Sequence, residues 1–150
     1  GAEGDAAAID LARTWVDALG GRMIRVDAAG KPLYHAAAVL ASNYVVALLA
    51  VAERIMHEAG VEPDSARDAL TELALGAVQN AAAVGPVEAL TGPIVRGDAG
   101  TVKLHLDRLS VEDRPLYSVL ARETLLLAQA RGLAPEPTAR IADLIQRGIS

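Results

Sequence analysis

Four polar residues that could do chemistry lie near the start of a long apolar stretch: Lys31, His35, Ser42 and Asn43. In a continuous helix, positions 31, 35, 38 and 42 fall close to one line, so Lys31, His35 and Ser42 would share a face. Asn43 would lie beside that face. A cation, an imidazole, a hydroxyl and an amide placed together could form a ligand site. Alternatively, Lys31 flanks a capped helix entrance, His35 is a hydrogen-bonded core residue, and Ser42 and Asn43 bond to a neighbouring backbone.

A second group of candidates lies in residues 90–98, with the sequence LTGPIVRGD. Its glycines and its proline predict a loop. A tight turn exposes backbone N–H groups, Thr91 adds a hydroxyl, and Arg96 offers a guanidinium that can bind a carboxylate or a phosphate. The alternative is a plain helix connector, in which Asp98 caps the next helix and Arg96 forms an ion pair.

The stretch between Pro32 and Gly60 is predicted to form one long helix that positions the first group. Pro32 suits the first helical turn, Gly60 suits the position after the last turn, and neither residue type occurs in between. From Ala36 to Ala52 the helix is apolar on almost every face, so it must be covered by other helices or lie in a membrane. Its length permits a membrane span. The interruptions at Ser42 and Asn43 and the many weakly apolar alanines argue against one, and we expect the central helix of an all-α domain.

Prolines and aspartates divide the rest of the sequence into further helices. Asp5 can cap a helix that ends near Leu19, and Asp98 can cap one over residues 99–109. Further helices are expected to begin at Pro63, Pro115 and Pro135. The buried stripe predicted after Pro63 is Leu70, Leu73, Ala74, Ala77, Val78 and Ala81, and the inward residues predicted after Asp98 are Val102, Leu106 and Leu109. The helix after Pro115 has a mixed face of Leu116, Val119, Leu120, Glu123, Leu126 and Leu127, and the last helix carries Ile141, Leu144 and Ile145.

Residues Arg22–Val26 predict one short strand. A lone strand needs a partner for its backbone groups. A helix followed by a strand is typical of the last unit of a parallel α/β sheet. We therefore assign residues 1–27 to the tail of a sheet domain and residues 28–150 to a helical domain. The alternative is a single small helical domain with an extended arm.

Composition narrows the function further. A chain of 150 residues fits about one domain and can bury a sizeable core. It contains no cysteine, which excludes disulfides and thiolate chemistry and fits a cytoplasmic location. The net charge of −5 without a basic block disfavours nucleic-acid binding. The three histidines fall on different elements or faces, so no metal site is predicted.

The sequences KPLYHAAAVLASNY and ALTGPIVRGD together resemble the C-terminal helical domain of bacterial proteins that combine a Rossmann-like domain with a domain of unknown function. Those proteins are related to NADP-dependent oxidoreductases such as phosphogluconate dehydrogenase and ketopantoate reductase. The resemblance covers essentially the whole chain. It implies that residues 1–27 end a Rossmann-like domain. It also implies that residues 28–150 form a helical domain like the C-terminal domain of phosphogluconate dehydrogenase, used for substrate binding and dimerisation.

The same resemblance implies a small keto or imino acid as substrate, held beside a Rossmann-like domain that carries NADP, in a homodimer. From the charge pattern and the polar interruptions described above, we expect neither nucleic acid nor membrane as a partner. The resemblance also implies that His35 is the proton donor, since histidine exchanges a proton near neutral pH. The match departs from the Lys-x-x-x-Asn pattern of the dehydrogenases, because Val39 stands four residues after His35. The residues implied in substrate binding are Lys31, Tyr34, Ser42, Asn43, Thr91, Gly92 and Arg96.

Two functions remain open from the sequence: part of an NADP-dependent oxidoreductase, or a non-catalytic helical module for dimerisation or ligand binding. This sequence contains no G-x-G-x-x-G turn between a strand and a helix. Such a turn lets the backbone approach the pyrophosphate of a dinucleotide. We therefore expect the chain alone neither to bind NADP tightly nor to transfer hydride.

Overall fold

In the computed structural model, which describes residues 4–149, most helices begin at or beside the prolines and aspartates that were predicted to start them. Carboxylates cap two of them: Asp5 accepts a hydrogen bond from the Ala8 N–H at 2.8 Å, and Asp98 accepts one from the Thr101 N–H at 3.0 Å. The predicted all-α fold is confirmed. The described helices are α1 (Ala6–Ala18), α2 (Lys31–Ala41), α3 (Asn43–Glu58), α4 (Pro63–Val84), α5 (Pro86–Ala89), α6 (Ala99–Arg108), α7 (Arg114–Ala130) and α8 (Pro135–Ile149).

The chain divides into two compact units, Gly1–Leu48 and Leu49–Ser150. The first unit contains α1, α2 and the beginning of α3, and the second contains the remainder of α3 and all later helices. The predicted domain boundary after residue 27 lies in the connection between α1 and α2, and it stays a prediction.

The long helix predicted between Pro32 and Gly60 has its expected extent but is interrupted at Ser42. Ser42 has φ −126° and ψ −76°, outside the α-helical region, and separates α2 from α3. Its carbonyl accepts hydrogen bonds from the N–H groups of Val45 and Val46, which starts α3 afresh. Serine and asparagine compete with helical bonding through their own side chains, which explains a break at this Ser-Asn pair. The predicted single line of polar residues is therefore wrong beyond α2, although Lys31 and His35 still share a face.

The predicted strand over Arg22–Val26 is wrong for most of its length. Only Arg25 has the bridge conformation of a paired strand residue, and the rest of the segment is irregular. A strand is stable only beside another strand that receives its backbone hydrogen bonds. The described part of the chain supplies no such neighbour.

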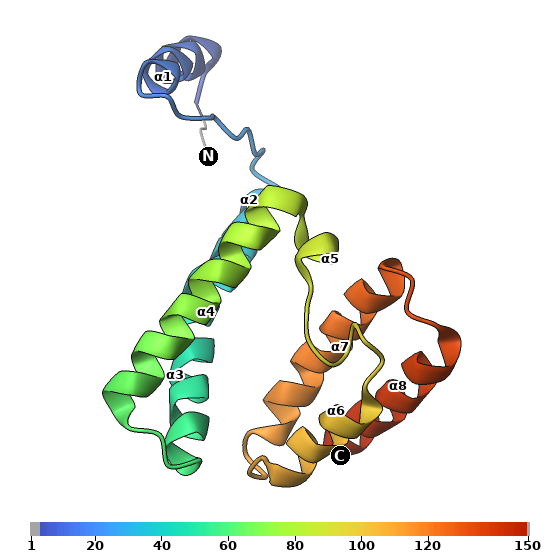
Figure 1. The fold of residues 1–150 in the computed structure, drawn as a ribbon. Coiled ribbons are helices and arrows are strands. Elements are labelled where there is room, and N and C mark those ends of the chain that lie inside the picture. Colours follow the sequence, from blue (N-terminus) through green and yellow to red (C-terminus); the bar gives the residue numbers. More distant parts are fainter. Residues whose placement is uncertain (1–3, 150) are drawn as a thin grey trace. The chain divides into compact units, whose positions relative to one another are not determined.

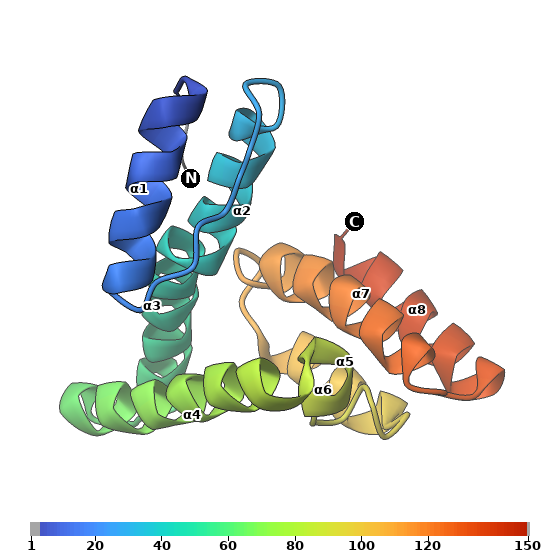
Figure 2. The same ribbon diagram turned by 90° about the horizontal axis from the view of Figure 1, so that it is seen from above.

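The core lies in the second unit, where α7 packs along α8 and α6 also packs against α8 (Figures 1 and 2). Val102 of α6 and Ile141 and Ile145 of α8 are buried, as predicted. The buried face of α7 differs from the mixed face expected from its large apolar residues, because small side chains allow α8 to approach closely. That buried face consists of Ser118, Ala121, Leu125 and Ala128.

Several apolar residues predicted to be covered are exposed. In α4 only Ala66 is buried, whereas Leu73 and Val78 are 70% and 59% exposed. In α2, Leu33 and Leu40 are 77% and 60% exposed. The predicted burial of these helices is therefore wrong for the single chain. Large exposed apolar side chains on neighbouring helical turns usually mark a surface that another molecule covers.

The segment Lys31–Glu58 is long and apolar enough to cross a membrane, judged by length and composition alone. The same test is passed by core helices of soluble proteins and by signal sequences. The helix is interrupted at Ser42, and the polar residue Asn43 follows the break. We therefore still expect this segment to pack against protein.

The C-terminal half of α3 is fixed to the connection between α6 and α7. The Arg54 guanidinium donates a hydrogen bond to the carboxylate of Asp113, which is buried. The other carboxylate oxygen accepts a hydrogen bond from the Ser110 hydroxyl at 2.9 Å. A buried carboxylate is tolerated only when it is paired and hydrogen-bonded in this way.

The substitution Gly97→Ala tests how the loop before α6 is packed. Gly97 has φ +70°, and a Cβ at this position would lie 2.9 Å from Cβ of Pro137 in α8. We expect a loss of about 2–4 kcal/mol in the free energy of unfolding, from about 1 kcal/mol of left-handed strain plus the overlap. Denaturant unfolding at fixed protein concentration measures this loss.

Gly60→Ala is the matched control, because Gly60 has φ +87° and open space around its Cβ position. It should lose only the contribution from strain, about 1 kcal/mol. Equal losses in the two variants would contradict the close contact between Gly97 and Pro137.

Candidate functional site

The loop from Leu90 to Asp98 is held in shape by its own backbone. The Gly97 N–H donates to the Ile94 carbonyl at 3.0 Å, and the Asp98 N–H donates to the Pro93 carbonyl at 2.9 Å. The Ile94 side chain is buried in the core and anchors the loop. The predicted loop is therefore confirmed, and it is a fixed turn attached to the helical core rather than a free connector.

Asp98 ends this loop and caps α6. Its second carboxylate oxygen accepts a hydrogen bond from the Thr101 hydroxyl at 2.6 Å. This bond, assisted by the Thr101 N–H and by the positive charge of Arg96, holds the pKa of the Asp98 carboxyl below its ordinary value. The carboxylate is therefore charged near neutral pH, and it contributes to the electrostatic surroundings of Arg96.

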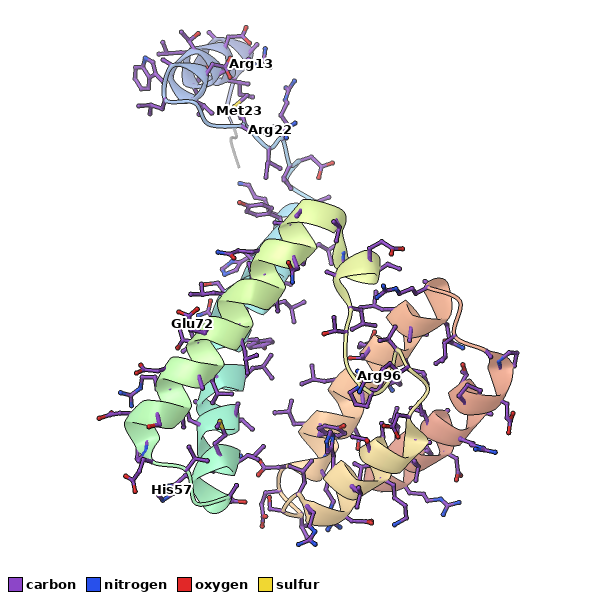
Figure 3. All side chains as sticks on the ribbon, viewed as in Figure 1. Arg13, Arg22, Met23, His57, Glu72 and Arg96 are labelled. Carbon is purple, nitrogen blue, oxygen red and sulfur yellow. The ribbon has the colours of Figure 1, made fainter. Side chains whose placement is uncertain are left out.

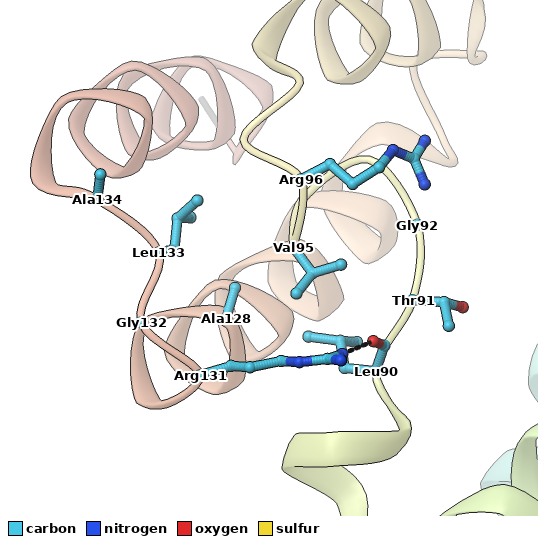
Figure 4. Close-up of a pocket in the computed structure, with 10 residues that line it drawn as sticks. All are labelled: Leu90, Thr91, Gly92, Val95, Arg96, Ala128, Arg131, Gly132, Leu133 and Ala134. Atoms are coloured by element: carbon cyan, nitrogen blue, oxygen red, sulfur yellow. Dashed lines mark hydrogen bonds between the residues drawn. The ribbon is translucent and has the colours of Figure 1, made fainter.

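A pocket of about 540 Å³ lies between this loop and the end of α7 (Figure 4). Its size falls in the range of pockets that hold small molecules. Val95 and Leu133 supply the apolar wall of the pocket. In Figure 4, the Arg96 guanidinium and the Thr91 hydroxyl extend from the loop and point away from Leu133. The lining residues are Leu90, Thr91, Gly92, Val95, Arg96, Ala128, Arg131, Gly132, Leu133 and Ala134.

Arg131 closes one edge of the pocket and was not predicted from the sequence. Its guanidinium donates a hydrogen bond to the Leu90 carbonyl and lies 3.8 Å from the Glu88 carboxylate. These contacts tie the end of α7 to α5. Because Arg131 is already engaged in them, we assign it to the shape of the pocket rather than to ligand binding.

Arg96 is the cation of this pocket that is available to a ligand. It lies on the loop that follows α5 (Figure 3), is exposed, and forms no ion pair with any residue that the structure describes. The Thr91 hydroxyl belongs to the same pocket and is exposed as well. A guanidinium and a hydroxyl beside an apolar wall can bind a small carboxylic acid or a phosphate ester.

The structure therefore brings Thr91, Gly92 and Arg96 together in one pocket of the second unit. The other predicted residues lie in the first unit: Lys31 opens α2, Tyr34 and His35 follow in its first turns, Ser42 marks the break, and Asn43 opens α3. All five are exposed. Their roles in substrate binding and proton transfer stay predictions.

The turn before α2 leads from a bridge residue into a helix, as a dinucleotide-binding turn leads from a strand into a helix, but it does not fit one. It runs from the bridge residue Arg25 to Gly30 at the start of α2. The Gly30 N–H already donates to the Asp27 carboxylate at 2.7 Å. A Cβ added at Gly30 would lie 3.1 Å from that same carboxylate, so the Asp27 side chain packs closely against the N–H that a phosphate would need. A negative side chain in this position also repels a pyrophosphate.

Residues 1–124 match the family model described as a domain of unknown function, DUF2520. No curated protein and no solved structure matches the chain. The match covers most of the sequence, including both motifs on which the resemblance rests, and it confirms the domain-of-unknown-function part of that resemblance. The chain belongs to the DUF2520 family.

Proposed function

We propose that this chain is the substrate-binding and dimerisation domain of an NADP-dependent oxidoreductase that acts on a small keto or imino acid. The observation that carries this proposal is the pocket beside the loop before α6. There Arg96, which has no ion pair with any described residue, and Thr91 line the same pocket as the apolar residues Val95 and Leu133. The resemblance of both motifs to NADP-dependent oxidoreductases supports the same assignment.

The chemistry of the pocket fits a short carboxylic acid. The guanidinium of Arg96 can form two parallel hydrogen bonds with a carboxylate, and Thr91 can donate a third. Val95 and Leu133 can contact a short aliphatic body. A ketopantoate-like acid has this combination of groups, which is why we place the substrate in this class.

His35 is the proposed proton donor, and Lys31, Tyr34, Ser42 and Asn43 are proposed to orient the substrate. His35 lies near the start of α2 and is open to solvent. A neutral-pH proton donor suits the reduction of a carbonyl or imine carbon, where the oxygen or nitrogen must gain a proton.

NADP would be bound by a Rossmann-like domain and not by this chain. The turn before α2 is closed by Asp27, as described above, and the loop before α6 follows a helical turn rather than a strand. We therefore assign no contact with the cofactor to any residue of this sequence.

Homodimer formation is the second part of the proposal. It is supported by Leu33 and Leu40 of α2 and by Val46 of α3, which are 77%, 60% and 68% exposed. A stable interface buries about 1,200–2,000 Å² with an apolar centre. A second copy of the chain would provide such cover for α2 and α3.

A non-catalytic dimerisation or ligand-binding module is the other candidate. The observation in its favour is Val39, which stands where the related dehydrogenases have the asparagine of the Lys-x-x-x-Asn pattern. A module of this kind would still use the Arg96 pocket, but it would not depend on His35.

The assembly is tested with Leu40→Glu. We expect the unsubstituted chain to be a dimer in light scattering at tens of micromolar, roughly the range that reveals weak dimers. A buried glutamate in the interface should raise the dimer dissociation constant at least about tenfold. Val111→Glu, in the exposed connection between α6 and α7, is the control and should stay dimeric. A monomeric unsubstituted chain contradicts the proposal.

The catalytic role is tested with His35→Ala in the full-length protein. We expect turnover of a small keto acid to fall roughly 10²–10⁴-fold, the usual contribution of a general acid, while the melting temperature stays nearly constant. His57→Ala, near the end of α3 (Figure 3), is the control and should retain full turnover. Unchanged turnover in His35→Ala would favour the non-catalytic module.

The cofactor assignment is tested by calorimetry with NADP and the present chain. We expect at most weak binding, because no turn described here can receive the pyrophosphate. Any weak binding should disappear in Arg96→Gln, since this guanidinium is the available cation of the loop. A dissociation constant in the low micromolar range, roughly 8 kcal/mol of binding free energy, would show that we have misplaced the cofactor site.

A further inference from the structure

A second cavity, of about 670 Å³, lies in the second unit and shares no lining residue with the Arg96 pocket. The C-terminal ends of α3 and α6 and the first turns of α7 enclose it. None of its residues takes part in the proposed function. Its lining includes Ile55, Glu58, His105, Arg108, Leu109 and Tyr117.

His105 and Tyr117 form a fixed pair in the wall of this cavity. The Nδ1 atom of His105 lies 2.8 Å from the Tyr117 hydroxyl, and the two rings meet edge to face at 89° with their centres 5.8 Å apart. Burial raises the pKa of the Tyr117 hydroxyl, so it stays protonated. A protonated hydroxyl can donate to Nδ1 of a neutral imidazole, and in that tautomer the ring proton lies on Nε2, where it can be donated to a ligand oxygen.

Glu58 and Arg108 bring opposite charges to the same cavity without neutralising each other. Neither side chain forms an ion pair or a hydrogen bond with any residue between 4 and 149 that the structure describes. Glu58 is the last residue of α3, where the partial negative charge of the helix end adds to its carboxylate. This end of the cavity therefore attracts a cation, whereas Arg108 and His105 attract an anion.

The wall between these charges is apolar. Ile55 of α3 and Leu109 after α6 line the cavity, and both are partly buried. A ligand that carried only an anion would leave Glu58 unpaired, and a ligand that carried only an amine would leave Arg108 unpaired. A molecule with both charges and an apolar side chain pairs with every group that lines the cavity.

We propose that this cavity binds an α-amino acid with an apolar side chain. Glu58 receives the ammonium group, Arg108 and the Nε2–H of His105 receive the carboxylate, and the side chain packs on Ile55 and Leu109. The volume is within the range of small-molecule sites and is large enough for a leucine-sized ligand. Because Glu58 and Arg108 are exposed, binding is expected to be in the tenths-of-millimolar range, roughly 5 kcal/mol.

Calorimetry on the full chain tests this proposal with three probes: L-leucine, 4-methylpentanoate, which lacks the ammonium, and 3-methylbutylamine, which lacks the carboxylate. We expect leucine to bind at least about tenfold more tightly than either of the other two, since each lost charge-assisted bond removes about 1.4 kcal/mol or more. No heat from leucine at up to about 10 mM, or equal affinity for all three probes, overturns the proposal.

Two variants assign the charges. Glu58→Gln should weaken leucine binding about tenfold and leave 4-methylpentanoate unaffected, whereas Arg108→Gln should weaken leucine and leave 3-methylbutylamine unaffected. Glu72→Gln on α4 and Arg122→Gln on α7 are matched controls outside the cavity and should bind leucine normally. If either control lost as much affinity as its partner variant, the assigned contacts would be wrong.

Arg96→Gln separates this site from the proposed function. It should leave leucine binding unchanged, because Arg96 lines the other pocket. Loss of leucine binding in this variant would place the amino acid in the Arg96 pocket and overturn the second site. Thermal melting of each variant verifies that it is folded, and Glu58→Ala, which also removes the charge, replaces Glu58→Gln if the latter is not.

Discussion

The close approach of α7 and α8 is the constraint on which the rest of the second unit depends. At Gly148 a Cβ would lie 2.3 Å from Oγ of Ser118, so only glycine fits without a shift of the surrounding atoms. Ser118 is fully buried, and its hydroxyl has no hydrogen-bond partner within the described chain. An unpaired buried hydroxyl costs about 1–3 kcal/mol. The fold accepts this cost because small residues allow the two backbones to pack tightly, and Ala128 on the same face then forms part of the pocket beside Arg131.

The sequence predicted the features that depend on local chemistry. Asp5 and Asp98 cap helices because a short carboxylate reaches the free N–H groups of the next turn, whatever lies elsewhere in the fold. The prolines mark helix starts for a similar local reason. The break at Ser42 was missed, because a serine inside an apolar run is compatible with either a continuous or an interrupted helix.

Features that depend on distant partners were predicted less well. We predicted the packing face of α7 from its large apolar residues. Packing of the helices instead buries mainly small residues of α7, namely Ser118, Ala121 and Ala128, together with Leu125. In the candidate site, Thr91, Gly92 and Arg96 belong to one local motif and occupy one pocket as a result. Arg131 reaches Leu90 across 41 positions, and no spacing rule reveals such a contact. The sequence did contain a signal for the pairing of His105 and Tyr117. His105 lies three residues before the end of α6, Tyr117 lies three residues after the start of α7, and a short connection joins these two helices.

The contact between Arg54 and Asp113 has a consequence for the order in which the chain folds. The two residues are separated by 59 positions, so their pairing closes a long loop, whereas α6, α7 and α8 follow one another along the chain. Local helical contacts form quickly, and the entropy of closing long loops delays distant ones. Before Arg54 arrives, the Asp113 carboxylate would be buried with only the Ser110 hydroxyl as a side-chain partner and with no opposite charge. We therefore expect α3 to dock after the folding transition state, with φ-values near zero for Arg54 and high values along α7 and α8.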